Sequence, residues 1–110
     1  MRREDSVRLR HMRDAALEAL SFVGGKNRRN LDDDRMLVLA LIKEVEIIGE
    51  AASRVSEETR TTLPRIPWAS IVAMRNRLIH AYFDVDRDVP WQTAAEDLPA
   101  LLEQLEAVTE

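Results

Sequence analysis

Apolar residues recur every three or four positions along most of this chain, which is the spacing of amphipathic helices and not of strands. The first such segment is expected to begin at a cap on Asp5 or Ser6 and to end at about Val23, where two glycines follow. Its apolar stripe consists of Leu9, Met12, Ala16, Leu20 and Val23. A polar, basic loop over residues 26–31 then leads to the second segment.

The second segment carries two apolar faces. It is predicted to begin at the acidic residues 32–34, whose charge favours a helix N-terminus, and to continue to about Thr62, shortly before Pro64. Its main apolar arc consists of Val38, Leu41, Ile42, Val45, Ile48, Ala52 and Val55, and the opposite side carries Met36, Leu39, Ala40 and Ile47. This pattern indicates a core on one side and a partner subunit on the other. Gly49 on the main arc weakens the helix by about 1 kcal/mol relative to alanine, which predicts a close approach by another helix.

Two more helices complete the predicted fold. Two prolines precede a helix that runs from about Trp68 to Tyr82. The last helix is expected to start around residues 89–91, and Pro99 is expected to kink or interrupt it. The sequence therefore predicts an all-α fold, an antiparallel four-helix bundle that forms a single domain over residues 1–110.

Composition narrows the class of protein. Of 110 residues, 45% are hydrophobic and 33% are charged, with only 3 glycines and 4 prolines, which is typical of helical soluble proteins. The absence of cysteine excludes disulfides and thiolate metal sites, and the acidic stretch 83–88 lacks the glycine turn of a calcium loop. The longest apolar run, residues 36–42, is too short to span a membrane, and no signal peptide is evident. We therefore expect a cytoplasmic protein without metal or cofactor, and its small size favours a homodimer.

Charge is distributed unevenly along the chain. The net charge of −4 argues against a bulk nucleic-acid binder of the histone kind. Basic residues nevertheless outnumber acidic ones up to residue 82, and the remainder of the chain is strongly acidic. Most of the cations are arginine, which suits bidentate contacts with phosphate. They cluster at Arg2, Arg3, Arg8, Arg10 and Arg13 and again at Arg28 and Arg29. Solvated helix faces explain the same charges.

The candidate chemistry is concentrated in residues 75–82, Arg-Asn-Arg-Leu-Ile-His-Ala-Tyr. The helix that contains them has a broad apolar arc consisting of Ile71, Val72, Met74, Leu78, Ile79 and Ala81. Arg75 and Tyr82 project within this arc. Burying a guanidinium without a partner is costly, so Arg75 needs a carboxylate, a cleft or a second subunit. Glu46 and Glu50 are the candidate counter-ions, although Glu50 fits an ordinary surface carboxylate equally well.

These residue types suit RNA cleavage without a metal. That reaction needs proton transfer at the 2′-hydroxyl and at the leaving 5′-oxygen, and a fixed cation for the charge that builds on the phosphorane. Histidine transfers protons at neutral pH, so His80 is the candidate acid or base. Arg75 would hold the phosphate, and Asn76, on the same polar flank as His80, would orient the phosphate or the histidine. Arg77 faces solvent, where it either contacts the RNA backbone or has a plain surface role. A lone helical histidine is more often structural, and His11 is assigned to the surface.

The order Arg75, four residues, His80, one residue, Tyr82, with Asn76 directly after the arginine, resembles the signature of the HEPN superfamily, specifically of its HepT-type toxins. The flanks resemble the same family along essentially the whole chain, in residues 46–52, 66–68, 82–86, Trp91 and 97–99. One departure is Ala81, because glycine is common in the family between the histidine and the tyrosine.

The resemblance implies a metal-independent endoribonuclease, an RNA hydrolase that is the toxin of a type VII toxin-antitoxin system. The sequence leaves open whether the RNA substrate is tRNA or mRNA. Family members commonly dimerise so that two motifs face one cleft. The resemblance also implies a partner, an MntA-type nucleotidyltransferase antitoxin that transfers AMP from ATP to Tyr82 and silences the toxin. The adenylate would add bulk and negative charge where the RNA phosphate binds.

Two alternatives remain open. In the first, the chain is a non-catalytic HEPN module that binds nucleotide or a partner and is associated with a nucleotidyltransferase, so that Arg75 and His80 only build a pocket. In the second, the chain is a structural helical dimer, and Tyr82 is an aromatic residue at its interface.

Overall fold

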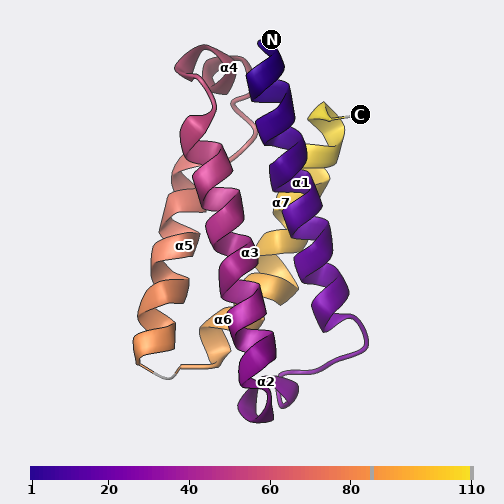
Figure 1. Ribbon diagram of the computed structural model, residues 1–110, viewed down its shortest axis with the longest axis vertical. Helices are drawn as coiled ribbons and strands as arrows, with labels where there is room; N and C mark the ends of the chain where they lie inside the picture. Colours follow the sequence, from indigo (N-terminus) through magenta and orange to yellow (C-terminus); the bar gives the residue numbers. More distant parts are fainter. Residues whose placement is uncertain (85, 110) are drawn as a thin grey trace.

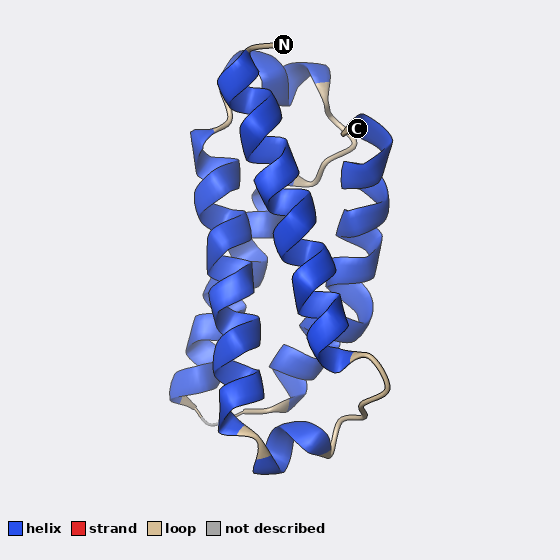
Figure 2. Cartoon of the chain, turned by 45° about the vertical axis from the view of Figure 1, so that its right-hand side comes forward, coloured by secondary structure: helices blue, strands red, loops and turns tan. Residues whose placement is uncertain are grey.

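Every regular element that the computed structural model describes is helical (Figure 2). The structure describes residues 1–84 and 86–109. The long helices are α1 (Arg3–Val23), α3 (Arg35–Arg54), α5 (Trp68–Phe83) and α7 (Leu98–Val108). The short elements are α2 (Asn30–Asp33), α4 (Glu57–Thr62), α6 (Asp88–Gln92) and a π-helical turn, Thr93–Asp97. The predicted all-α fold is confirmed.

The long helices run in alternating directions, and α2, α4 and α6 lie at the ends where the chain turns (Figure 1). Helix α3 lies between α1 and α5, and α7 packs against α1 on the far side of this view. Their apolar stripes meet in one core, whose fully buried members include Leu9, Met12, Val45, Ile48, Ile71, Leu78, Leu98 and Leu105. None of the described helices is both long and apolar enough to cross a membrane.

Helix α1 begins at Arg3, so the predicted cap at Asp5 or Ser6 is wrong. Asp5 is buried in the first turn and accepts three hydrogen bonds, from the Ser56 amide at 3.0 Å, the Ser56 hydroxyl at 2.6 Å and the Thr59 hydroxyl at 2.6 Å. These bonds, led by the one from the Ser56 hydroxyl, lower the pKa of Asp5 to about 2. Asp5 is an aspartate, a residue type that often caps helices, but here it ties α1 to the start of α4.

The predicted second helix is wrong in its length, because the chain leaves the helical conformation at Val55 (φ −67°, ψ 133°). Val55 stays in the core, while the hydroxyl of Ser56 caps α4 by accepting a hydrogen bond from the Thr59 amide at 3.2 Å. The apolar period continues through Val55, so it gives no sign of this turn. At the other end, Asp34 caps α3 by accepting a bond from the Leu37 amide at 3.0 Å. The separate helix α2 spans the end of the predicted loop and the predicted start of the second helix.

The expected interruption at Pro99 is confirmed, and it takes the form of a wider turn. Residues Thr93–Asp97 are π-helical, and the Leu98 amide bonds to the Thr93 carbonyl five residues earlier. The hydrogen bonds of this turn span five residues where those of an α-helix span four. The change comes just before Pro99, which has no amide hydrogen to donate. The chain then continues as α7 with Pro99 in its first turn, where no such donor is needed.

The second apolar face of α3 is exposed in the single chain, and the partner subunit predicted to cover it stays a prediction. Met36, Leu39 and Ile47 are 81%, 40% and 36% exposed, whereas the main arc is buried. On α5, Val72 is 53% exposed, so its predicted place in the buried arc is wrong, and Phe83 is exposed as well. The structure contains one chain, so the homodimer stays a prediction.

A carboxyl group is buried between α1 and α3. Glu44 is 4% exposed, and its Oε2 atom has no hydrogen-bond partner among the described residues. Burial, followed by a hydrogen bond with Glu18 and repulsion from its charge, raises the pKa of Glu44 to about 7. A hollow of about 210 Å³ beside this carboxyl is also lined by His11 and Asp14.

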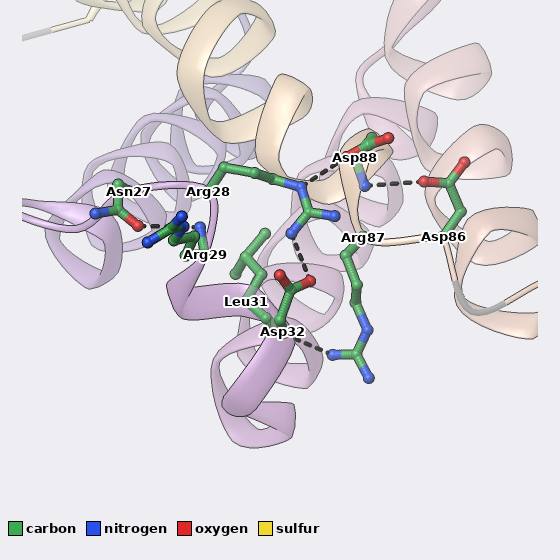
Figure 3. Close-up of polar contacts among 8 residues, drawn as sticks. All are labelled: Asn27, Arg28, Arg29, Leu31, Asp32, Asp86, Arg87 and Asp88. Atoms are coloured by element: carbon green, nitrogen blue, oxygen red, sulfur yellow. Dashed lines mark hydrogen bonds and ion pairs between the residues drawn. The ribbon is translucent and has the colours of Figure 1, made fainter.

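Arg28, from the second arginine cluster, lies at the α2 end of the molecule (Figure 3). Its Nε atom is 2.7 Å from Asp88 Oδ1 and its Nη1 atom is 2.7 Å from Asp32 Oδ1, which ties α2 to α6. Beside it, the Arg87 guanidinium donates to the Leu31 carbonyl at 2.9 Å. Arg28 therefore has the intrachain acidic partners that the surface interpretation expects, but it lies half-buried in the turn before α2 and not on a solvated helix face.

Candidate functional site

Helix α5 carries the whole motif, but the motif residues face different directions. The helix begins at Trp68, whose indole Nε1 donates to the Leu63 carbonyl at 3.1 Å, and it ends at Phe83. Its core side is buried and consists of Ile71, Met74, Leu78 and Ala81. The motif side chains are therefore spread around the remaining surface of the helix.

Arg75 lies half-buried where α5 packs against α3. Its side chain passes over Gly49, because a Cβ atom at position 49 would lie 3.1 Å from Arg75 Cδ. The close approach predicted at Gly49 is thus confirmed, and the group that approaches is the arginine stem. At the tip of that stem, Nη1 donates a long hydrogen bond of 3.4 Å to Asn76 Oδ1, so the two motif residues are in contact.

Arg75 lines a hollow of about 440 Å³ that is built from α1, α3 and α5. We call it the Arg75 hollow, and its lining consists of Arg8, His11, Lys43, Glu46, Ile47, Glu50, Ala51, Arg54 and Arg75. Both candidate counter-ions lie in it, but the ion pair that Glu50 forms is with Arg54, at 2.7 Å. Among the described residues, no ion pair joins Arg75 to Glu46 or Glu50. Four cationic side chains and two carboxylates give the hollow a positive balance, which favours an anionic ligand.

His80 is exposed and lies outside the Arg75 hollow. Five residues along an α-helix correspond to about 7.5 Å along its axis and to a rotation of about 140°. One chain therefore does not bring Arg75 and His80 together. The helix surface between them is exposed or half-buried and carries Val72, Asn76, Ile79 and Phe83. An exposed stripe with this apolar content is typical of a surface that another molecule covers.

The histidine that shares the hollow with Arg75 is His11 of α1. Its predicted surface position is confirmed, since it is exposed, but no pattern in the sequence connects it to the motif. Nor does any pattern identify Arg8 and Lys43 as neighbours of Arg75. These residues come from α1 and α3, and the pattern of charge alone does not distinguish them from solvated cations elsewhere on the same helices.

Tyr82 lies near the other end of α5, half-buried in a separate hollow of about 290 Å³. Its hydroxyl accepts a hydrogen bond from Arg35 Nη2 at 2.9 Å. The Phe83 ring packs edge-on against it, with 5.8 Å between ring centroids. Arg87 lines the same hollow. The phenol is therefore hydrogen-bonded to one arginine and shares its hollow with another, a setting that its position in the motif does not reveal.

Arg77 lies outside both hollows. Its Nη2 atom is 3.0 Å from Oδ2 of Asp97 in the π-helical turn, and both side chains are exposed to solvent. This ion pair favours the surface interpretation of Arg77, and a contact with RNA stays a prediction. Among the residues that the structure describes, no three His, Asp or Glu side chains are grouped so that they could hold a metal ion.

Comparison with known proteins identifies the family to which this chain is similar. The family described as Ribonuclease HepT-like matches residues 12–108. The chain is 32% identical over 95 residues to the "Putative RNase MJ1380" of Methanocaldococcus jannaschii, covering 86% of this chain and 87% of the relative. It is 44% identical over 68 residues to the "Probable ribonuclease HepT" of Thermococcus cleftensis, covering 62% of each. No solved structure matches the chain significantly.

An all-helical fold with Arg75, His80 and Tyr82 on one helix has the characters of a HEPN protein. The family match over residues 12–108 and the similarity to the M. jannaschii relative identify the family within this superfamily. The chain belongs to the HepT-like ribonuclease family. The resemblance seen in the sequence is thereby confirmed.

Proposed function

We propose that this chain is a metal-independent endoribonuclease, the toxin of a type VII toxin-antitoxin pair, with Arg75, Asn76 and His80 as its catalytic residues. The observation that carries the proposal is the intact motif of a HepT-like ribonuclease in an accessible setting. His80 is exposed, and Arg75 lines a hollow rich in cations. Glu50 and Arg77 have supporting roles, Glu50 through its ion pair with Arg54 in the hollow and Arg77 as a contact with the RNA backbone.

In the proposed reaction, His80 removes the proton of a ribose 2′-hydroxyl, and the 2′-oxygen attacks the adjacent phosphorus. The bond from phosphorus to the 5′-oxygen breaks, and that oxygen takes a proton from a second acid. The products are a 2′,3′-cyclic phosphate and a 5′-hydroxyl. Arg75 holds the phosphate and stabilises the charge that builds on its oxygens, while Asn76, within hydrogen-bond reach of Arg75, orients it.

The second acid is proposed to be His80 of a second copy in a homodimer. A contact that covers the exposed stripe of α5 would bring two motifs to one cleft, and Val72 and Phe83 give this stripe its apolar surface. Met36, Leu39 and Ile47 on α3 would add apolar area to the contact. A symmetric contact of this kind closes on itself as a dimer.

Silencing is proposed to act at Tyr82, through a cognate MntA-type nucleotidyltransferase antitoxin. The Tyr82 oxygen would attack the α-phosphorus of ATP, pyrophosphate would leave, and the phenol proton would pass to the antitoxin or to solvent. Two observations support this role: the hydroxyl accepts a hydrogen bond from Arg35, and Arg87 lines the same hollow. Guanidinium groups in these places offset the negative charge of a phosphodiester.

One observation favours a second candidate function, a non-catalytic HEPN module that binds nucleotide or a partner. Within one chain Arg75 and His80 point in different directions, so a monomer would present the hollow without a complete catalytic set.

The test of the proposed function is to incubate the purified chain with total RNA in excess EDTA and to analyse the fragment ends. We expect fragments that end in 2′,3′-cyclic phosphate, because the reaction uses a histidine and a guanidinium in place of a metal. Mass spectrometry of the same preparation verifies that Tyr82 is unmodified. An unmodified protein that leaves the RNA intact would favour the non-catalytic module.

We expect the Gly49→Ala variant to be at least as stable as the parent and yet less active. Alanine favours a helix by about 1 kcal/mol over glycine, whereas its methyl group would lie 3.1 Å from Arg75 Cδ and push the side chain aside. A displaced cation stabilises the developing charge less well, so cleavage should slow by about 3- to 10-fold. Thermal unfolding and cleavage rates of one preparation test this, and a variant that is less stable or equally active would contradict it.

A further inference from the structure

The Arg75 hollow contains cations for which the proposed reaction has no use. Besides Arg75, it is lined by Arg8 from α1 and Lys43 from α3. In the part of the chain that the structure describes, none of these three has an ion-pair partner, whereas Arg54 in the same hollow is paired. Three helices thus contribute unpaired positive charge to one place, where Glu46 is the remaining carboxylate.

The size and the lining of the hollow indicate the kind of ligand. A volume of about 440 Å³ is within the range of sites that hold small molecules, so there is room for a nucleotide unit. The lining contains no Phe, Tyr or Trp side chain, its one ring is the imidazole of His11, and its apolar part is limited to Ile47 and Ala51. The hollow therefore offers a base little stacking surface, and its positive charge favours the phosphate backbone. Guanidinium and ammonium groups bind phosphate oxygens whatever the base.

We propose that the Arg75 hollow is a subsite for the phosphate backbone of single-stranded RNA, in which Arg8 and Lys43 hold the phosphate next to the one that is cut. The inference rests on the proposed function, since it takes RNA to be the ligand and Arg75 to contact the scissile phosphate. The subsite gives affinity without sequence preference, because its cations meet only the backbone. It also assigns a role to Arg8 within the first arginine cluster.

The experiment measures binding of fluorescent oligo(U) and oligo(A) RNA to the full chain in EDTA over a series of salt concentrations. All proteins carry His80→Ala so that the RNA stays intact. The test variant adds Arg8→Ala and Lys43→Ala. The matched control adds Arg10→Ala and Lys26→Ala, which removes one arginine and one lysine at exposed positions outside the hollow. Circular dichroism melts verify folding, and the corresponding glutamine substitutions replace any variant that fails to fold.

We expect the test variant to bind both oligomers about 10-fold more weakly than the His80→Ala parent at physiological salt, and the control to differ by less than about 2-fold. The slope of log affinity against log salt should fall by about 0.7 in the test variant, since Arg8 and Lys43 hold one phosphate and each phosphate neutralised on a single strand contributes about 0.7. Equal losses in the test and control variants would overturn the subsite. So would a preference of about 10-fold between the two oligomers, because it would show readout of the base.

The failure of the subsite and the failure of the proposed function give different results. If the subsite is wrong, the chain with its native His80 still cleaves total RNA to cyclic phosphate ends, and only the comparison between the test and control variants is negative. If the proposed function is wrong, that chain leaves RNA intact, and the His80→Ala parent binds neither oligomer. The second result overturns both proposals.

Discussion

The His80→Ala variant is expected to cleave RNA at least about 10²-fold more slowly than the parent chain, because a general acid or base contributes about 10²- to 10⁴-fold. The fold should be unchanged. The His80 side chain is exposed, so its removal leaves the core intact. The backbone carbonyl of residue 80 accepts a hydrogen bond from the Asp84 amide at the end of α5, and alanine keeps this carbonyl. In cells that express the chain, toxicity should vanish together with cleavage.

Two companion measurements separate chemistry from structure. Added imidazole should restore part of the activity of the His80→Ala variant, because the position is open to solvent and a free imidazole can carry the proton. Glu106→Ala removes an exposed side chain from α7 and serves as the control, which should cleave at the parent rate. A His80→Ala variant that cuts as fast as the parent and leaves the same ends would show that His80 is not the acid or base.

The second large effect is expected on stability. Replacing Glu44 by glutamine should raise the melting temperature by about 5 °C at about pH 8 and change it little at about pH 5. The pKa of Glu44 is about 7 in the fold, whereas an unfolded glutamate has a pKa of about 4.3. The folded chain therefore binds a proton over an interval in which the unfolded chain has released it. The stability linked to Glu44 is complete below the unfolded pKa and is lost as the pH rises through the folded one.

Melting curves of the parent and the Glu44→Gln variant across this interval provide the measurement. Glu103→Gln, an exposed change on α7, is the control and should give no dependence of this kind. Asp5 acts in the opposite sense, since its pKa is lowered to about 2 and its contribution is lost only as the pH falls below the ordinary carboxyl range. The pH ranges over which the stability linked to Glu44 and to Asp5 changes are therefore separate. A difference between Glu44→Gln and the parent that stays constant with pH would contradict the prediction.

The long helices were predictable from the sequence because each repeats its apolar period over several turns. Val55 shows the limit of that reasoning. The period passes through it unbroken, yet the chain turns there, since Ser56 caps a new helix and also bonds to Asp5, 51 residues earlier. A tie of this kind depends on how α1 lies against α4, and neither partner has a local signature that reveals the other.

The candidate site was predictable as a set of residues but not as an arrangement. The motif spacing together with its flanks singles out Arg75, His80 and Tyr82 as the proposed site, and helical geometry already implies that Arg75 and His80 diverge. The bond from Arg35 to Tyr82, across 47 residues, and the cations that share a hollow with Arg75 depend on the packing of α1 and α3 against α5. These neighbours decide what the motif contacts, and they follow only from the folded chain.

The two hollows on α5 also set a length scale. Arg75 and Tyr82 are seven residues apart, which corresponds to about 10 Å along the helix axis, and each lines a hollow of its own. A group attached to the Tyr82 oxygen must therefore reach along two helical turns before it obstructs the Arg75 guanidinium. A bare phosphate is too short for that reach, whereas an extended nucleotide is long enough. In the proposed silencing at Tyr82, this spacing along α5 sets the minimum length of a group that can block Arg75.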